Sequence, residues 1–126
     1  MSVAYEYSLL QQNDHQTPYK RVKGVLSIEG EELLFEFKVY DPAGNMLSTL
    51  NKFSINVEYL KNIDFKKGLF SGRLSIETTK MVFLDPLPGS SQGRITLKIS
   101  RSDRNYAHDF AQKLRIALSE RKLKEL

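Results

Sequence analysis

The fold is decided by residues 103–123, which read DRNYAHDFAQKLRIALSERKL and predict one long amphipathic helix after an otherwise strand-like chain. Apolar side chains recur there at the i, i+3, i+4 and i+7 spacing that places them on one stripe. This stripe consists of Ala107, Phe110, Ala111, Leu114, Ala117 and Leu118. A lone helix with one apolar stripe must bury it against a sheet. We therefore expect Phe110 and Leu114 to anchor the helix in the open end of a small β-barrel.

Upstream of this helix, apolar and polar residues alternate as they do in half-buried strands. The alternation predicts about seven strands, at residues 22–28, 33–39, 53–59, from Ile63 onward, 74–78, 81–84 and 95–99. The first two form a hairpin, and residues 74–78 and 81–84 form another. The predicted fold is mainly β with one C-terminal helix: a partly open antiparallel barrel of about seven strands, capped by an amphipathic α-helix.

The chain is long enough for one domain. Its 126 residues, of which 40% are hydrophobic, can bury a core that needs no disulfide or metal. Residues 1–20 show no firm hydrophobic period. We interpret residues 1–20 as an N-terminal arm and residues 21–126 as the domain.

The composition excludes several kinds of chemistry. There is no cysteine, so disulfides, thiolate zinc sites and thiol catalysis are absent, which is compatible with a reducing cytoplasm. No stretch reaches the roughly 18 apolar residues of a membrane span. The start of the chain lacks the basic and apolar segments of a secretion signal. We therefore expect a soluble, cytoplasmic protein.

Candidate catalytic groups are few. The two histidines are His15 in the arm and His108 on the polar side of the helix. His108 is adjacent to Asp109, and adjacent helical side chains diverge by about 100°. No nucleophile-elbow, zinc-protease, P-loop or dinucleotide-binding motif is present. We expect no enzyme activity, no metal and no cofactor.

A resemblance to a known fold lies in the residues between Ile63 and Ile76, which read IDFKKGLFSGRLSI, and in the helix over residues 103–118. Both resemble parts of bacterial pleckstrin-homology-like (PH-like) domains, over roughly residues 20–122. A lipocalin-like or other small barrel is the alternative. The resemblance implies a binding scaffold, and this fold serves phosphoinositides, peptides and proteins alike.

The resemblance also bears on lipid binding. PH domains that bind phosphoinositides carry basic residues around the loop between their first two strands. With residues 22–28 as the first strand, that loop is Glu-Gly-Glu-Glu at residues 29–32, and only Lys23 and Lys38 stand nearby. Three carboxylates repel a phosphorylated head group. We therefore expect no selective phosphoinositide binding.

Candidate contact residues come from two loops and the helix. Leu69 and Phe70 lie between two glycines, flanked by Lys66, Lys67 and Arg73. Such a tip inserts into a membrane or a partner, or folds back onto the barrel rim, and we favour folding back. Leu87, in the proline-rich loop of residues 85–93, is another possible partner contact.

The basic excess lies mainly on the helix. Residues 101–126 hold seven basic and four acidic side chains of the chain's 19 and 15. Lys113, Arg121 and Lys122 are therefore candidates for contact with an anion, although we favour the simpler explanation that they form a solvated helix face.

These patterns predict a non-catalytic binding or assembly module that contacts a protein partner or itself. The alternative function is peripheral binding of an anionic membrane or nucleic acid through the basic helix face. Nucleic acid is disfavoured because the tyrosines show no stacking pattern on one strand. An open barrel leaves strand edges, so we expect a homo-oligomer that pairs through residues 52–59 or through the strand ending near Leu84.

Overall fold

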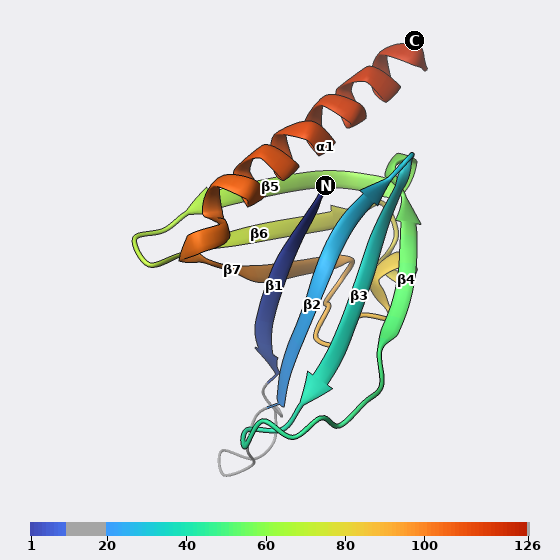
Figure 1. Cartoon of the computed structure of the whole chain (residues 1–126). Coiled ribbons are helices and arrows are strands. Elements are labelled where there is room, and N and C mark those ends of the chain that lie inside the picture. The colour runs from blue at the N-terminus through green and yellow to red at the C-terminus, as the bar shows by residue number, and fades with distance from the viewer. Residues whose placement is uncertain (10–19, 126) are drawn as a thin grey trace.

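The computed structural model describes residues 1–9 and 20–125 and consists of one antiparallel sheet with a helix across its open end (Figure 1). The sheet has seven strands in the order β4-β3-β2-β1-β7-β6-β5, and this order leaves it unclosed. The strands are β1 (Ser2–Leu9), β2 (Lys20–Glu29), β3 (Glu32–Tyr40), β4 (Asn51–Asn56), β5 (Leu60–Lys67), β6 (Ser71–Thr78) and β7 (Arg94–Ser100). A 3-10 turn (η3, Arg101–Asp103) leads into the helix α1 (Arg104–Lys124).

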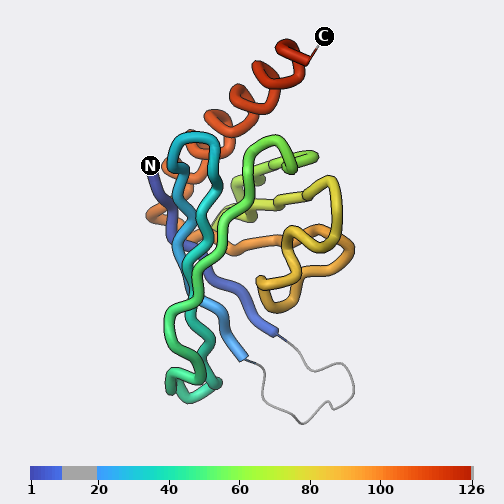
Figure 2. Tube along the Cα trace, turned by 90° about the vertical axis from the view of Figure 1, so that its right-hand side faces the viewer, coloured from blue at the N-terminus to red at the C-terminus, as the bar shows by residue number. Residues whose placement is uncertain are grey.

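The sheet consists of two meanders that cross each other. Strands β1 to β4 form one meander and β5 to β7 the other, and Figures 1 and 2 show the second running across the first. They are joined between β1 and β7, where the register has one partner pair, Glu6 and Lys98. A strongly twisted sheet of this kind wraps around its own inner face. The helix α1 then covers the end that the sheet leaves open.

The helix is anchored as the sequence predicts. Phe110 is fully buried and Leu114 nearly so, and both belong to the single hydrophobic core. Inward side chains of both meanders, including Phe35, Ile63 and Leu97, complete that core. The predicted fold class is therefore confirmed: mainly β, an unclosed antiparallel sheet and one C-terminal helix. This arrangement is compatible with a PH-like fold.

The number of strands is as expected, but the first strand was missed. The assignment of residues 1–20 to an arm is wrong for residues 2–9, which form β1 between β2 and β7. The alternation is present in Val3, Tyr5, Tyr7 and Leu9, but two of these inward residues are tyrosines, which occur at both buried and exposed positions and so make the period less distinct. The remaining arm residues, 10–19, lie outside the described residues.

The apolar run at residues 81–84 is not a strand. It forms the 3-10 helix η2 (Met81–Leu84), and the hairpin partner of β6 is β5 rather than this run. Four consecutive apolar residues show no period of two, and only Leu84 among them is buried. The strand expected at residues 53–59 likewise stops at Asn56, whose side chain accepts a hydrogen bond from the Glu58 amide and starts the 3-10 helix η1 (Val57–Tyr59).

These corrections change which strands lie at the edges of the sheet. The strands at the two ends of the sheet are β4 and β5. Arg115 of α1 donates to the Ile63 carbonyl at 2.9 Å and pairs with Asp64 at 2.6 Å, so the helix is fastened to β5. The run that ends at Leu84 is a 3-10 helix and therefore offers no strand edge. The edge strand β4, within residues 52–59, is the one that stays available for the predicted pairing.

Candidate functional site

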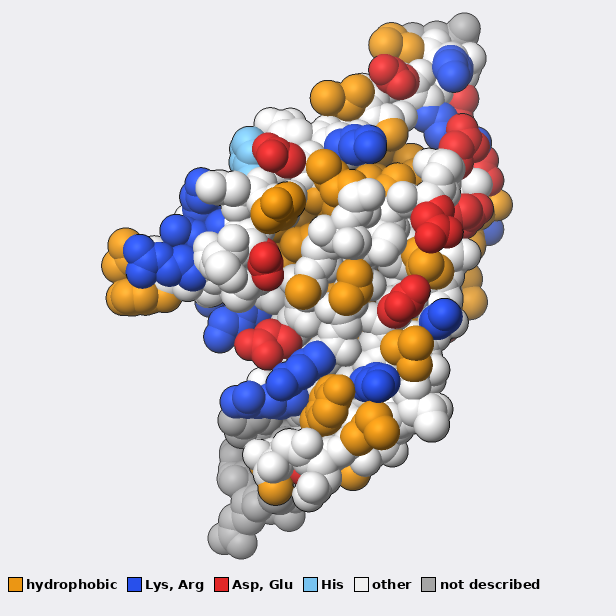
Figure 3. Space-filling model, in the orientation of Figure 1, with side chains coloured by type: hydrophobic (Ala, Val, Ile, Leu, Met, Phe, Trp, Pro, Cys, Tyr) orange, Lys and Arg blue, Asp and Glu red, His pale blue; other side chains and the backbone are white. Residues whose placement is uncertain are grey.

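The hairpin of β5 and β6 projects from the body of the molecule and carries apolar side chains at its tip (Figure 3). Leu69 is 79% and Phe70 76% exposed. The expectation that they fold back onto the barrel rim is therefore wrong. The Gly68 amide donates to the Ser71 carbonyl at 2.7 Å and closes a tight turn. Leu69 and Phe70 are the two central residues of this turn, and it is too short for their side chains to contact the barrel rim.

The start of α1 holds this hairpin in place. Arg104 donates to the Gly68 carbonyl at 2.6 Å, and Lys67 donates to the Asn105 side-chain oxygen at 2.9 Å. Gly72 lies directly against the ring of Phe65, because a Cβ at Gly72 would lie 2.4 Å from that ring. The apolar tip is therefore presented by an anchored hairpin.

A row of mostly basic side chains crosses the outer face of the sheet from this hairpin. Cross-strand partners in consecutive strands connect β5 to β3 through β6, β7, β1 and β2. We call these residues the basic row: Lys66, Arg73, Lys98, Glu6, Lys23 and Lys38. Each of the six has at least one strand neighbour in the core or packed against it, and successive side chains of a strand point to opposite faces, so all six face outward. In Figure 3, Lys and Arg side chains extend from the hairpin at the left across the lower part of this face.

A polar hollow of about 380 Å³ adjoins the middle of the basic row. It lies where the two meanders meet at β1 and β7, and both Arg73 and Lys98 line it. The hollow is also lined by three serine and threonine side chains and by three other residues. The first three are Ser8, Ser71 and Thr96, and the others are Glu6, Tyr7 and Arg21. The hollow thus combines cations with hydrogen-bond donors, as surfaces that receive oxyanions do.

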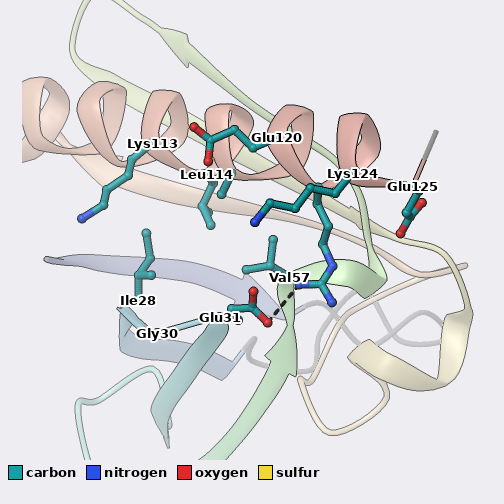
Figure 4. Close-up of a pocket in the computed structure, with 11 residues that line it drawn as sticks. Ile28, Gly30, Glu31, Val57, Lys113, Leu114, Glu120, Lys124 and Glu125 are labelled. Atoms are coloured by element: carbon teal, nitrogen blue, oxygen red, sulfur yellow. Dashed lines mark ion pairs between the residues drawn. The ribbon is translucent and has the colours of Figure 1, made fainter.

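A second cavity, which we call the α1 groove, lies between the helix and the turn that joins β2 to β3 (Figure 4). Its volume is about 400 Å³. Apolar side chains line its floor: Ile28, Val57, Leu114 and Ala117. In Figure 4, Lys113 and Lys124 extend from the helix toward the sheet at its margins.

Arg121 bridges the helix to the sheet beside this groove. Its guanidinium pairs with Glu31 at 2.9 Å and with Glu58 at 3.0 Å. The hydrogen bond that Arg121 donates to Glu31, and after it the charges of both carboxylates, raises the pKa of Arg121, although partial burial acts in the opposite sense. Because both carboxylates already neutralise Arg121, it fits poorly among the predicted anion contacts. Lys113 and Lys122 remain predictions.

Leu87 is not a surface contact. It is 1% exposed and belongs to the core, which contradicts its expected exposure in the proline-rich loop. Its amide donates to the Leu84 carbonyl, so the chain turns inward after η2. Proline content indicates an irregular segment, but it does not indicate which side chain of that segment is buried.

Metal-binding and acid–base groups do not converge in the described part of the chain. His108 lies on the helix surface, where it contacts Asp109 at 3.5 Å. Among residues 1–9 and 20–125, no group of three or more His, Asp or Glu side chains is placed to hold a metal ion. The absence of enzyme activity stays a prediction.

The structural premise of the lipid prediction is wrong. The first two strands are β1 and β2, so the loop between them consists of residues 10–19, which the structure does not describe. Residues 29–32 instead form the turn between β2 and β3. Lys20, Arg21 and Lys23 at the start of β2 follow the true first loop. The expected lack of phosphoinositide binding stays a prediction without its original support.

Comparison with known proteins gave no matching family, no matching curated protein and no matching solved structure. The described residues contain no helix that is both long and apolar enough to span a bilayer. The function must therefore be argued from the surfaces themselves.

Proposed function

We propose that this chain is a non-catalytic binding module of PH-like fold that holds a short segment of a partner protein in the α1 groove. The observation that carries the proposal is the apolar floor of that groove, about 400 Å³ in volume, between the helix and the β2–β3 turn. Concave, mostly apolar cavities with a few polar groups at their margins are the usual ligand-binding sites of proteins.

The length of the groove limits what it holds. Lys113 and Lys124 stand at its margins and are eleven residues apart on one helix, which corresponds to about 16 Å at 1.5 Å per residue. An extended chain covers this distance with about five residues at 3.3 Å each. The proposed ligand is therefore a short extended segment.

Charge indicates the chemistry of that segment. Arg121 is occupied by Glu31 and Glu58, whereas the ammonium groups of Lys113 and Lys124 extend toward the space beside the floor (Figure 4). Glu120 and Glu125 also line the groove, and both lie within four residues of Lys124. A segment with apolar side chains for the floor and a carboxylate near Lys113 therefore satisfies both features. Such an acidic amphipathic segment is the partner chemistry we propose.

Ala117 offers a direct test because it lines the groove and is only partly buried. We expect peptides selected on the wild-type protein to be apolar and acidic, and to lose at least tenfold in affinity for Ala117→Arg, whose side chain fills the groove. Ile116→Arg is the matched control, because Ile116 is the preceding helical residue and is 57% exposed.

Peptide selection followed by fluorescence anisotropy measures these affinities. Selection of no such peptide, or equal binding to Ala117→Arg and wild type, overturns the proposal. The cytoplasmic location and the homo-oligomer stay separate predictions, tested by fractionation and by measurement of mass.

A further inference from the structure

We infer that the β5–β6 hairpin and the basic row together form a contact surface for an anionic lipid bilayer. This inference goes beyond the proposed function, because it concerns another surface and another class of partner. It also moves the expected membrane contact from the helix face to the outer face of the sheet.

The apolar end of this surface is suited to insertion. Leu69 and Phe70 are both more than three-quarters exposed at the end of a projecting hairpin. Two large apolar side chains on a convex tip cannot bury each other, and they are removed from water only when something surrounds the tip. A bilayer interface does this without a preformed pocket, whereas a protein partner would need a matching cavity.

Lys67 and Arg104 hold the tip of the hairpin in its projecting position. Their hydrogen bonds to Asn105 and to the Gly68 carbonyl fasten the hairpin to the start of α1. Insertion therefore requires little additional ordering of the chain, which favours binding. Both cations also stay close to the tip, where lipid phosphates would lie if the tip entered the interface.

The basic row supplies the charge. Lys66, Arg73 and Lys98 are direct cross-strand partners on three neighbouring strands, and like charges in that position destabilise a sheet. The row contains one carboxylate, Glu6, which stands between Lys98 and Lys23 and leaves the row with a net positive charge. An external layer of negative charge relieves this repulsion, and anionic head groups supply such a layer.

The combination favours a lipid surface over nucleic acid. Nucleic acid is bound through phosphates and base stacking, and at the tip Phe70 offers one ring beside Leu69, which contributes to neither. A bilayer engages both parts at once, the tip by insertion and the row by charge. Dual contacts of this kind are what stable peripheral binding needs.

Vesicle sedimentation tests this inference with the full-length protein. The probes are vesicles of phosphatidylcholine alone and vesicles that contain about 30% phosphatidylserine, in 0.1 M salt. We expect strong preference for the anionic vesicles and a loss of at least tenfold when the salt is raised to about 0.5 M.

Three variants separate the parts of the surface. Leu69→Ser with Phe70→Ser should weaken binding at least tenfold, with unchanged folding because both side chains are exposed. Arg73→Glu with Lys98→Glu should weaken binding by about fivefold or more for each charge. The matched control, Lys113→Glu with Lys122→Glu on the helix, should change binding by less than about twofold.

The inference is overturned if the protein binds neutral and anionic vesicles equally, or if Leu69→Ser with Phe70→Ser binds anionic vesicles as the wild type does. Binding lost only in the helix variant also overturns it and restores the helix face as the contact. Charge variants that abolish binding while the tip variant does not would indicate a purely electrostatic surface, as for nucleic acid. Ala117→Arg should bind vesicles like wild type, so failure of the groove proposal is recognised separately.

Fluorescence gives an independent measurement of insertion. The chain contains no tryptophan, so Phe70→Trp introduces a single indole at the tip. Its emission should shift to shorter wavelength with anionic vesicles and be quenched by brominated acyl chains. Leu123→Trp, at the exposed far end of α1, is the control and should show neither change.

Discussion

Replacement of Phe110 by alanine tests how the helix closes the fold. Phe110 is fully buried in the core beneath α1. A buried phenylalanine covers on the order of 200 Å², which at about 25 cal/mol per Å² corresponds to about 5 kcal/mol. Alanine retains part of this contact and the unfolded chain already buries some surface, whereas the cavity adds a cost. We therefore expect Phe110→Ala to lower the free energy of unfolding by about 3 to 5 kcal/mol.

Urea denaturation followed by circular dichroism measures that change. The domain's total stability is expected to be about 5 to 15 kcal/mol, so the loss is a large fraction of it. Ile116→Ala is the control on the same helix, and it should stay within about 0.5 kcal/mol because Ile116 is mostly exposed. A value for Phe110→Ala within the same 0.5 kcal/mol would show that α1 does not close the core.

Three further predictions concern pH, assembly and lipid selectivity. Burial raises the pKa of the Tyr5 and Tyr7 hydroxyls above the ordinary value near 10. The free energy of unfolding should therefore fall as the pH rises above about 10, because tyrosines ionise there in the unfolded chain but not in the folded one. Urea titrations should show a smaller fall for Tyr7→Phe than for the wild type. Light scattering after size exclusion should give an oligomer paired through the β4 edge, and a monomeric mass at all micromolar concentrations would refute it. Vesicles of equal charge should bind equally with or without a phosphoinositide, and a stereospecific preference would contradict this.

Some features of the fold follow from local sequence alone. The helix over α1 is encoded by its apolar stripe, and Phe110 and Leu114 occupy the buried positions that the period of 3.6 assigns to them. The β2–β3 hairpin is likewise encoded by its alternation and its turn. In both cases the residues that decide the structure are neighbours in the chain.

Local patterns were insufficient where burial depends on distant partners. Tyr5 and Tyr7 are inward residues of a strand because β2 and β7 flank them and because their hydroxyls donate to the carbonyls of Glu36 and Pro88. Leu87 is buried because η2 turns it inward. No short window of sequence contains the partners of Tyr5 and Tyr7, and the inward turn at Leu87 depends on how η2 packs on the sheet.

The candidate surfaces divide in the same way. The sequence alone indicated the KKGLFSG turn with its apolar pair and flanking cations, because glycine positions and residue types are local properties, but it paired the strand after this turn with the wrong segment. Only the tertiary structure decided that Leu69 and Phe70 are exposed and that Lys66, Arg73 and Lys98 continue into one row. The row arises from the register of strands that are far apart in the chain, and that register is set by how the whole sheet buries its inner face.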